Sequence, residues 1–184
     1  MSSTDKHRKI KTYELEKIVV EHFRPRQNLV VPNVSWGFFG HSRNSDNHEA
    51  DLLVCTDAGC LWEIELKVSK SDLLADFKKR HRHFDSRLKH VWFAMPFDLV
   101  ATAEQLLDER FGIMYPEWRE VETPYWVSSG WHIVVHRKPK QLSDYKATDK
   151  EKQELLRLCA LRVWGLKAKL GKMMSRSLDD TSSK

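Results

Sequence analysis

The feature that most constrains this chain is a pair of apolar segments separated by a very short turn. Residues 50–56 and 60–68 are rich in Leu, Val, Ile, Cys and Trp, as strands in a buried sheet are. Between them stands Asp57-Ala58-Gly59, and a short connection that contains Gly is typical of a β-hairpin. The sequence therefore predicts two neighbouring antiparallel strands.

Charged residues occupy every other position in the second of these strands. Glu63, Glu65 and Lys67 alternate with three apolar residues. Because successive side chains of a strand point to opposite faces, the charged side chains share one face and the apolar ones share the other. One face of this strand is therefore predicted to be apolar and the other to carry three charges.

The hairpin also brings Asp51 of the first strand next to Glu65, so two carboxylates and the Lys67 ammonium form one small patch. Two carboxylates this close repel each other unless a cation lies between them, and Mg²⁺ held by one or two carboxylates is the usual solution. Such a patch can activate a water for attack on a phosphodiester. The same pattern also fits a structural Glu-Lys pair on a surface strand, and the pattern alone favours neither interpretation.

Hydrophobic periodicity and turn residues predict the other elements. The predicted helices cover residues 12–23, 71–88, 99–110 and 149–172, and the further predicted strands cover residues 29–31, 34–39, 90–95, 112–115 and 131–136. Pro32 interrupts the early strand, which is typical of an edge or bulged strand. The order begins with a helix, three strands, a helix and a strand, so we expect an α/β fold with a mixed central sheet and an added C-terminal helix.

The length of 184 residues suits one full domain and is short for two. We expect a flexible polar arm at residues 1–11, a single domain at residues 12–174 and a disordered tail at residues 175–184. Hydrophobic residues make up 41% of the chain, which excludes a largely disordered protein.

The sequence favours a cytoplasmic protein. No apolar run approaches the roughly 20 residues that cross a bilayer, and residues 1–11 are polar. The three cysteines, Cys55, Cys60 and Cys159, are an odd number without CxxC spacing, which suggests neither a disulfide framework nor a cysteine zinc site. We expect neither a membrane partner nor a small-molecule cofactor.

The net charge of +5 is distributed unevenly along the chain. Residues 67–90 hold eight Lys or Arg against three acids, whereas residues 98–123 hold seven acids against two bases. Segregated basic charge suggests a polyanionic partner, although basic helices also occur as solvated faces. The bases that closely follow the charged strand are the candidate phosphate contacts: Lys70, Lys78, Lys79 and Arg82.

These motifs resemble those of the PD-(D/E)XK nuclease superfamily. Asp51, followed after a turn by Glu65-Leu66-Lys67 and flanked by predicted helices, is similar to its D…(D/E)xK signature. More narrowly, residues 63–78 and 91–96 resemble the MmcB-like DNA-repair branch. Ala50 stands before the aspartate, where the superfamily motif has proline. The resemblance implies a restriction-endonuclease-like αβββαβ core.

The resemblance also implies roles for individual residues. Asp51 and Glu65 would bind Mg²⁺ or Mn²⁺, the Leu66 carbonyl would supply a further ligand, and Lys67 would position the attacking water. Members of the superfamily often add another acid, for which the accessory candidates in this sequence are Glu14, Glu21, Glu49 and Glu63. For Glu14, Glu21 and Glu49, the sequence favours a solvated position over a role in the site.

Two further acids follow the charged strand. Asp72 and Asp76 lie four residues apart on the predicted helix 71–88, and they match a repeated acid of the MmcB-like branch. The match suggests a role near the site. An acid that favours the dipole at the helix N-terminus explains Asp72 equally well.

The sequence thus predicts a metal-dependent nuclease that hydrolyses phosphodiester bonds of DNA, in DNA repair or in the processing of mobile-element or phage DNA. Two alternatives remain: a nuclease-like module that binds nucleic acid without cleaving it, and an RNA-processing nuclease with the same site. The presence of Asp51, Glu65 and Lys67 together argues against the first, because a pure binder has no need for two close carboxylates. The sequence does not separate DNA from RNA.

Overall fold

The structure, a computed structural model, describes residues 10–35, 49–78, 86–122 and 127–182. The chain divides into two compact units, Met1–Ala147 and Thr148–Lys184. The second unit contains one long helix, α4 (Asp149–Ser182). The sequence predicts a single domain to residue 174 and a disordered tail after it. The division into compact units falls before α4, and this helix continues to Ser182.

The first unit contains the other described elements. Its helices are α1 (Thr12–His22), α2 (Lys70–Lys78), the short 3₁₀ helix η3 (Phe97–Leu99) and α3 (Val100–Leu106). Its strands are β1 (Leu29–Ser35), β2 (Glu49–Cys55), β3 (Leu61–Leu66), β4 (Leu88–Ala94), β5 (Gly112–Glu122) and β6 (Val127–Arg137). None of the described helices is both long enough and apolar enough to cross a membrane.

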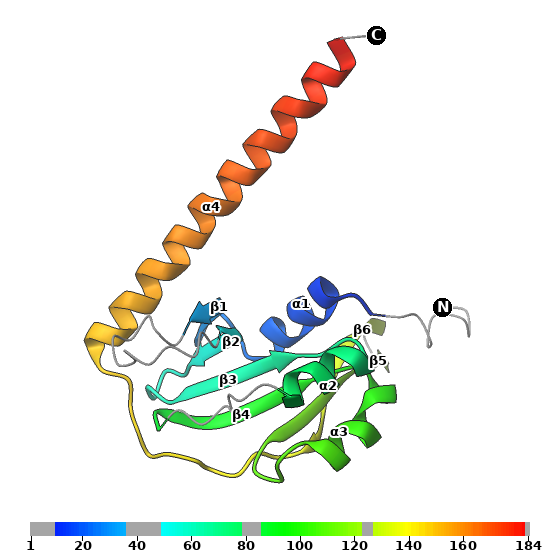
Figure 1. Ribbon diagram of the computed structural model, residues 1–184, viewed down its shortest axis with the longest axis vertical. Helices are drawn as coiled ribbons and strands as arrows, with labels where there is room; N and C mark the ends of the chain where they lie inside the picture. Colours follow the sequence, from blue (N-terminus) through cyan, green and yellow to red (C-terminus); the bar gives the residue numbers. More distant parts are fainter. Residues whose placement is uncertain (1–9, 36–48, 79–85, 123–126, 183–184) are drawn as a thin grey trace. The chain divides into compact units, whose positions relative to one another are not determined.

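The described strands form one mixed sheet in the order β1-β2-β3-β4-β5-β6 (Figure 1). β1, β2 and β3 are antiparallel neighbours, β3, β4 and β5 run parallel, and β6 returns antiparallel to β5. Each parallel connection contains a helix, as parallel strands require. The α/β fold with an αβββαβ core and a mixed sheet is therefore confirmed, and β1, which contains Pro32, lies at the sheet edge as expected.

The predicted hairpin joins β2 to β3. Its turn closes with a hydrogen bond of 2.7 Å from the Gly59 amide to the Thr56 carbonyl. Gly59 has a φ of 79°, a left-handed conformation that costs glycine little and most other residues a steric clash. The Gly in this turn therefore sets the register of the two strands.

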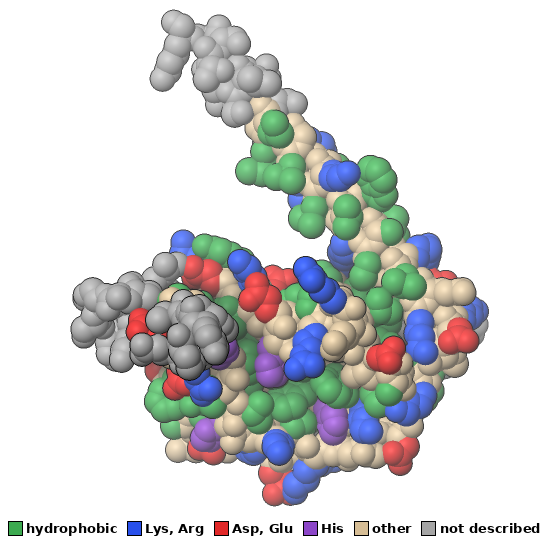
Figure 2. Space-filling model, turned by 180° about the vertical axis from the view of Figure 1, so that it is seen from behind, with side chains coloured by type: hydrophobic (Ala, Val, Ile, Leu, Met, Phe, Trp, Pro, Cys, Tyr) green, Lys and Arg blue, Asp and Glu red, His purple; other side chains and the backbone are tan. Residues whose placement is uncertain are grey.

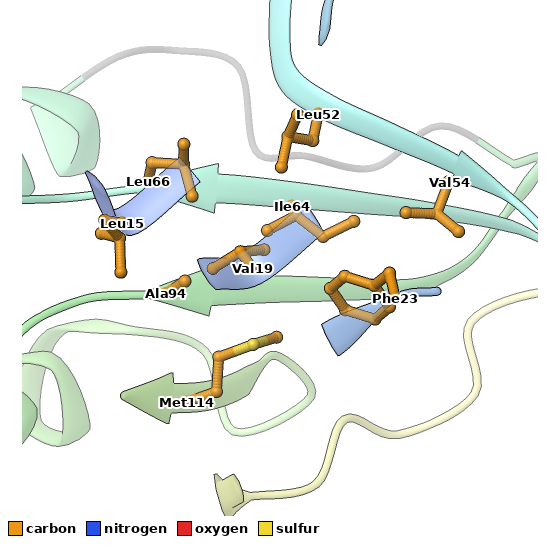
Figure 3. Packing of buried hydrophobic residues seen from close by; sticks show 9 residues of the cluster. All are labelled: Leu15, Val19, Phe23, Leu52, Val54, Ile64, Leu66, Ala94 and Met114. Carbon is orange, nitrogen blue, oxygen red and sulfur yellow. The ribbon is translucent and has the colours of Figure 1, made fainter. Parts of the chain in front are cut away.

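Helix α1 packs on the face of the sheet that carries the apolar residues of β3. Leu15, Val19 and Phe23 recur every four residues and so lie on one side of the helix. They contact the central strands in a buried cluster (Figure 3). The strand residues of this cluster are Leu52, Val54, Ile64, Leu66, Ala94 and Met114. This packing leaves the opposite face of β3 for its charged residues.

Several predicted elements differ from the structure in their bounds. The helix predicted at 71–88 is α2, which ends at Lys78, and Leu88 begins β4, where it pairs with Leu61; residues 79–85 lie outside the described part. The spacing of Leu88 fits a helix, but pairing with β3 buries this side chain completely. The strands predicted at 112–115 and 131–136 are parts of the longer pair β5 and β6.

We predict that Gly112→Ala destabilises the protein. Gly112 in β5 pairs with Trp92 in β4, and an added Cβ would overlap the Trp92 ring. Relief of such an overlap shifts the ring or the strand and costs roughly 1–3 kcal/mol in the free energy of unfolding, measured by urea denaturation. Gly130→Ala is the matched control, because a Cβ at Gly130 in β6 meets nothing within 4 Å. Equal stability of both variants would contradict this packing.

Candidate active site

The register of the hairpin places the two predicted carboxylates on one face of the sheet. Leu52 pairs with Ile64 and Leu53 with Glu63, so Asp51 stands opposite Glu65 when the same register is continued by one residue. Directly opposite residues of antiparallel strands have their side chains on the same face. Asp51 and Glu65 therefore share the face that lies opposite α1.

Lys67 lies at the centre of these acids. Its Nζ donates a hydrogen bond of 2.7 Å to Glu65 Oε2, and it lies 3.5 Å from Asp76 Oδ1 and 4.0 Å from Asp51 Oδ2. We call these four residues the Lys67 cluster. The side chains of Lys67, Glu65 and Asp76 are only 3–4% exposed, whereas that of Asp51 is 39% exposed. Solvent therefore reaches the cluster at Asp51.

Backbone contacts fix the acidic side of the cluster. Asp51 Oδ2 accepts a hydrogen bond of 2.8 Å from the Leu66 amide, which holds the carboxylate against β3. On the other side of β3, the Lys67 amide donates to the Ala94 carbonyl of β4 at 2.9 Å. The end of β3 is thus held by both neighbours, so Glu65 and Lys67 project from a rigid segment.

Helix α2 brings Asp76 to the cluster. Ser69 caps this helix, because its Oγ accepts a hydrogen bond of 3.2 Å from the Asp72 amide and its carbonyl accepts one of 3.1 Å from the Leu73 amide. Asp76 lies one turn further along and is buried, whereas Asp72 is exposed. Of the two acids that match the MmcB-like pattern, only Asp76 reaches Lys67.

The surroundings of Lys67 keep it protonated. Burial acts to lower the pKa of Lys67, but the charges of Glu65, Asp76 and Asp51, together with the hydrogen bond to Glu65, outweigh burial and raise this pKa above its usual value. Lys67 is therefore an ammonium at neutral pH. It can donate hydrogen bonds and stabilise negative charge, but it cannot accept a proton from water.

Glu16 is a neighbour of the site that the sequence did not indicate. It lies on α1, and its pKa is raised, first by partial burial and then by the negative charge of Asp51. The expected helix acids lie elsewhere: Glu14 Oε2 accepts from the Lys11 amide at the helix start, and Glu21 is an exposed partner of Lys17. Sequence periodicity gives the apolar side of α1, but it does not show which acid at the border of that side is affected by the charge of Asp51.

The other predicted residues take different positions. Glu63 is completely buried on the same face of β3 as Glu65, and Glu49 is exposed at the start of β2. Leu66 contributes its amide to Asp51, and the predicted role of its carbonyl stays a prediction. Lys70 is exposed at the start of α2. Lys78 ends this helix with a side chain outside the described part, which also excludes Lys79 and Arg82.

Metal ligands are sparse in this arrangement. Within the part of the chain that the structure describes, no group of three or more His, Cys, Asp or Glu side chains is placed to hold a metal ion. In the Lys67 cluster, the Lys67 ammonium lies among the acids and binds Glu65 directly. From the described residues, a metal at this site would therefore take two carboxylates at most, with backbone oxygen or water as further ligands.

Comparison with known proteins supports the fold. No protein-family model matches the sequence, and no curated protein matches it either. Among solved structures, the chain is similar to the SPO1766 protein of unknown function from Silicibacter pomeroyi, with a TM-score of 0.58 and 18% sequence identity. The match covers 87% of this chain and 93% of that chain. At this identity the likeness shows a shared fold and nothing of activity.

We predict that Lys67→Met strongly destabilises the protein. The variant removes the ammonium that pairs with the nearly buried carboxylates of Glu65 and Asp76, and removal of one partner of a buried pair costs about 3–5 kcal/mol. Because the pKa of Lys67 is raised in the folded state, its stabilisation is complete at neutral pH and declines only as pH rises through that raised value. Chemical denaturation at pH 7 measures the loss.

Lys17→Met is the matched control for this prediction. Lys17 also pairs with a glutamate, Glu21, but both side chains are mostly exposed. Lys17 Nζ and Glu21 Oε1 are 4.0 Å apart. An exposed pair of this kind contributes at most about 0.5 kcal/mol. If Lys67→Met loses no more stability than Lys17→Met, the Lys67 cluster is not held together by its ammonium.

A second prediction concerns Glu16. An acid whose pKa is raised by folding binds its proton more tightly in the folded state, so its ionised form destabilises the fold above its unfolded pKa of about 4.3. Glu16→Gln should therefore raise the melting temperature slightly at pH 7 and leave it unchanged at pH 4 or below. The gain corresponds to less than about 1 kcal/mol, because Glu16 is only partly buried. A loss of stability at pH 7 would show that the Glu16 carboxylate has a favourable partner instead.

Proposed function

We propose that this chain is a metal-dependent nuclease that hydrolyses phosphodiester bonds of DNA. The observation that carries the proposal is the convergence of Asp51, Glu65 and Lys67 at one place on the sheet, where one acid is open to solvent. These residues match the D…(D/E)xK pattern in both spacing and face. The αβββαβ fold that carries them is the one the nuclease resemblance implies.

The chemistry of the donor set fits Mg²⁺ or Mn²⁺. Asp51 and Glu65 offer hard carboxylate oxygens, and Mg²⁺ commonly takes one or two carboxylates and keeps several waters. The Lys67 cluster contains three acids and one ammonium, which leaves a net charge of −2 when all are ionised. A divalent cation beside Asp51 and Glu65 would neutralise this charge. When bound, it would polarise the phosphodiester and lower the pKa of a bound water.

The protein side chains have separate roles in this proposal. Asp51, held by the Leu66 amide, presents a fixed carboxylate at the open side of the cluster. The Lys67 ammonium lies 4.0 Å from Asp51 Oδ2. From there it can orient the attacking water and stabilise the charge that develops on the phosphate. Asp76 is a positioning residue, because its Oδ1 lies 3.5 Å from Lys67 Nζ. It belongs to helix α2, which borders the cluster.

DNA is the proposed substrate because the chain carries an excess of basic residues, which suits a polyanion. The chain carries 31 Lys and Arg against 26 Asp and Glu, and Lys70 is an exposed base at the start of the helix that also supplies Asp76. Phosphate contacts of this kind supply affinity without sequence preference. The same charge suits RNA, so the substrate is decided by assay. The proposed setting is DNA repair or the processing of mobile-element or phage DNA, in the cytoplasm.

We expect purified protein to cleave DNA with Mg²⁺ or Mn²⁺ and not with EDTA. Asp51→Asn and Glu65→Gln should each lower the cleavage rate at least about 100-fold, because they remove charge and keep the side-chain shape. Asn at position 51 still offers an oxygen to the Leu66 amide, so this variant should fold normally. The assay uses supercoiled, linear, branched and single-stranded DNA, and RNA, with melting curves for every variant.

Glu21→Gln is the control, because this exposed glutamate of α1 pairs only loosely with Lys17. It should cleave at the wild-type rate. Full activity of a folded Asp51→Asn would rule out the proposed mechanism. Metal-independent binding of DNA without cleavage would favour the nuclease-like binding module, and cleavage of RNA alone would favour the RNA-processing nuclease.

A further inference from the structure

Helix α4 leaves a series of large apolar side chains exposed. Leu156, Val163, Leu166, Leu170 and Met173 are 52–67% exposed. Figure 2 shows hydrophobic side chains, drawn in green, along this helix with Lys and Arg between them. Single apolar residues on a surface need no explanation, but a contiguous apolar face marks a site of contact.

The spacing of these residues identifies the kind of contact. Together with Cys159 they occupy positions 156, 159, 163, 166, 170 and 173, which are separated alternately by three and four residues. This is the a and d pattern of a heptad repeat, in which each side chain inserts between four residues of a facing helix. We call these six residues the apolar stripe. Its geometry fits a second helix as the occupant.

The charges beside the apolar stripe are all of one sign. Residues 155–178 contain six Lys or Arg and no acid. In the heptad numbering, Arg162 and Lys169 fall at g positions and Lys167 falls at an e position, where they flank the stripe. Lys167 also lies 5.0 Å above the Trp164 ring, an exposed contact of modest energy. Residues at e and g select coiled-coil partners by charge, so this helix selects acids.

Pairing of α4 with a second copy of itself would place basic residues opposite basic residues. In a parallel pair, a g position faces the e position five residues further along the partner, which sets Arg162 of one copy against Lys167 of the other. An antiparallel pair sets g against g and e against e, so bases again face bases. Self-pairing is therefore disfavoured.

Two other occupants explain less of the pattern. A lipid surface favours a helix whose opposite side is polar, but Leu161, on the side away from the apolar stripe, is 54% exposed. DNA would account for the bases and would leave the stripe in water. An acidic helix with its own apolar seam accounts for both the spacing and the charge.

We propose that the apolar stripe of α4 binds an acidic amphipathic helix of another protein as a two-stranded coiled coil. The partner helix carries apolar residues at its a and d positions and Asp or Glu at its e and g positions. This function is independent of phosphodiester hydrolysis, because α4 belongs to the second unit and the Lys67 cluster to the first. The helix would bring the nuclease to an assembly that contains the acidic partner.

The test measures binding of the full chain to two designed three-heptad peptides by fluorescence anisotropy. Both peptides carry the same Val and Leu seam, one with Glu and the other with Lys at every e and g position. The full chain should bind the Glu peptide at least about tenfold more tightly than the Lys peptide. Leu166→Asp should abolish binding, whereas Leu161→Asp, at an equally exposed position outside the stripe, should not. Circular dichroism checks that both variants keep their helix content.

A charge-reversed variant tests selection separately from apolar contact. Arg162→Glu, Lys167→Glu and Lys169→Glu together should reverse the preference, so that the Lys peptide binds more tightly. Equal binding of the two peptides, or Leu166→Asp without effect, would overturn the proposal. A dimer of the full chain in sedimentation equilibrium that Leu166→Asp dissociates would also overturn the proposal, because a second copy would then be the occupant. Binding to phosphatidylglycerol vesicles without peptide binding would mark a lipid surface instead.

Discussion

The arrangement of this protein depends on one buried cation. Lys67 loses almost all contact with water, and an ammonium in such a place needs negative partners to remain charged. Glu65, Asp76 and Asp51 supply them from β3, α2 and β2, so the strand that carries the lysine is tied to elements before and after it. The four residues of the Lys67 cluster together carry three acids and one base. Under the proposed function, a divalent cation would lie beside Asp51 and Glu65 and offset part of this negative charge.

The two faces of β3 explain how a small sheet supports such a cluster. The face under α1 is a closed apolar core, in which Ile64 and Leu66 pack with the helix (Figure 3). The opposite face carries the alternate residues, and there the burial of Glu65 and Lys67 is offset by their mutual hydrogen bond. A one-residue slip of the strand would exchange the faces, so the hairpin turn at Gly59 indirectly fixes the chemistry of the site.

Much of the site follows from the sequence because it depends on local rules. The turn before β3 and the two-residue period of the strand are sufficient to place Asp51, Glu65 and Lys67 on one face. Glu16 was not foreseen because its proximity to Asp51 depends on how α1 is rotated on the sheet, which packing decides. Leu88 was assigned to the wrong element for a similar reason: its spacing fits a helix, and only long-range pairing with β3 shows it to be in a strand.

The central claim is that Asp51 and Glu65 form a cation site and not only a set of partners for Lys67. A crystal structure of the protein in Mn²⁺, with anomalous scattering recorded at the manganese edge, tests this claim most directly. The account predicts one strong anomalous peak in contact with both the Asp51 and Glu65 carboxylates, with Lys67 still beside them. An anomalous map without density at these carboxylates, in crystals that bind Mn²⁺ elsewhere or not at all, would contradict it.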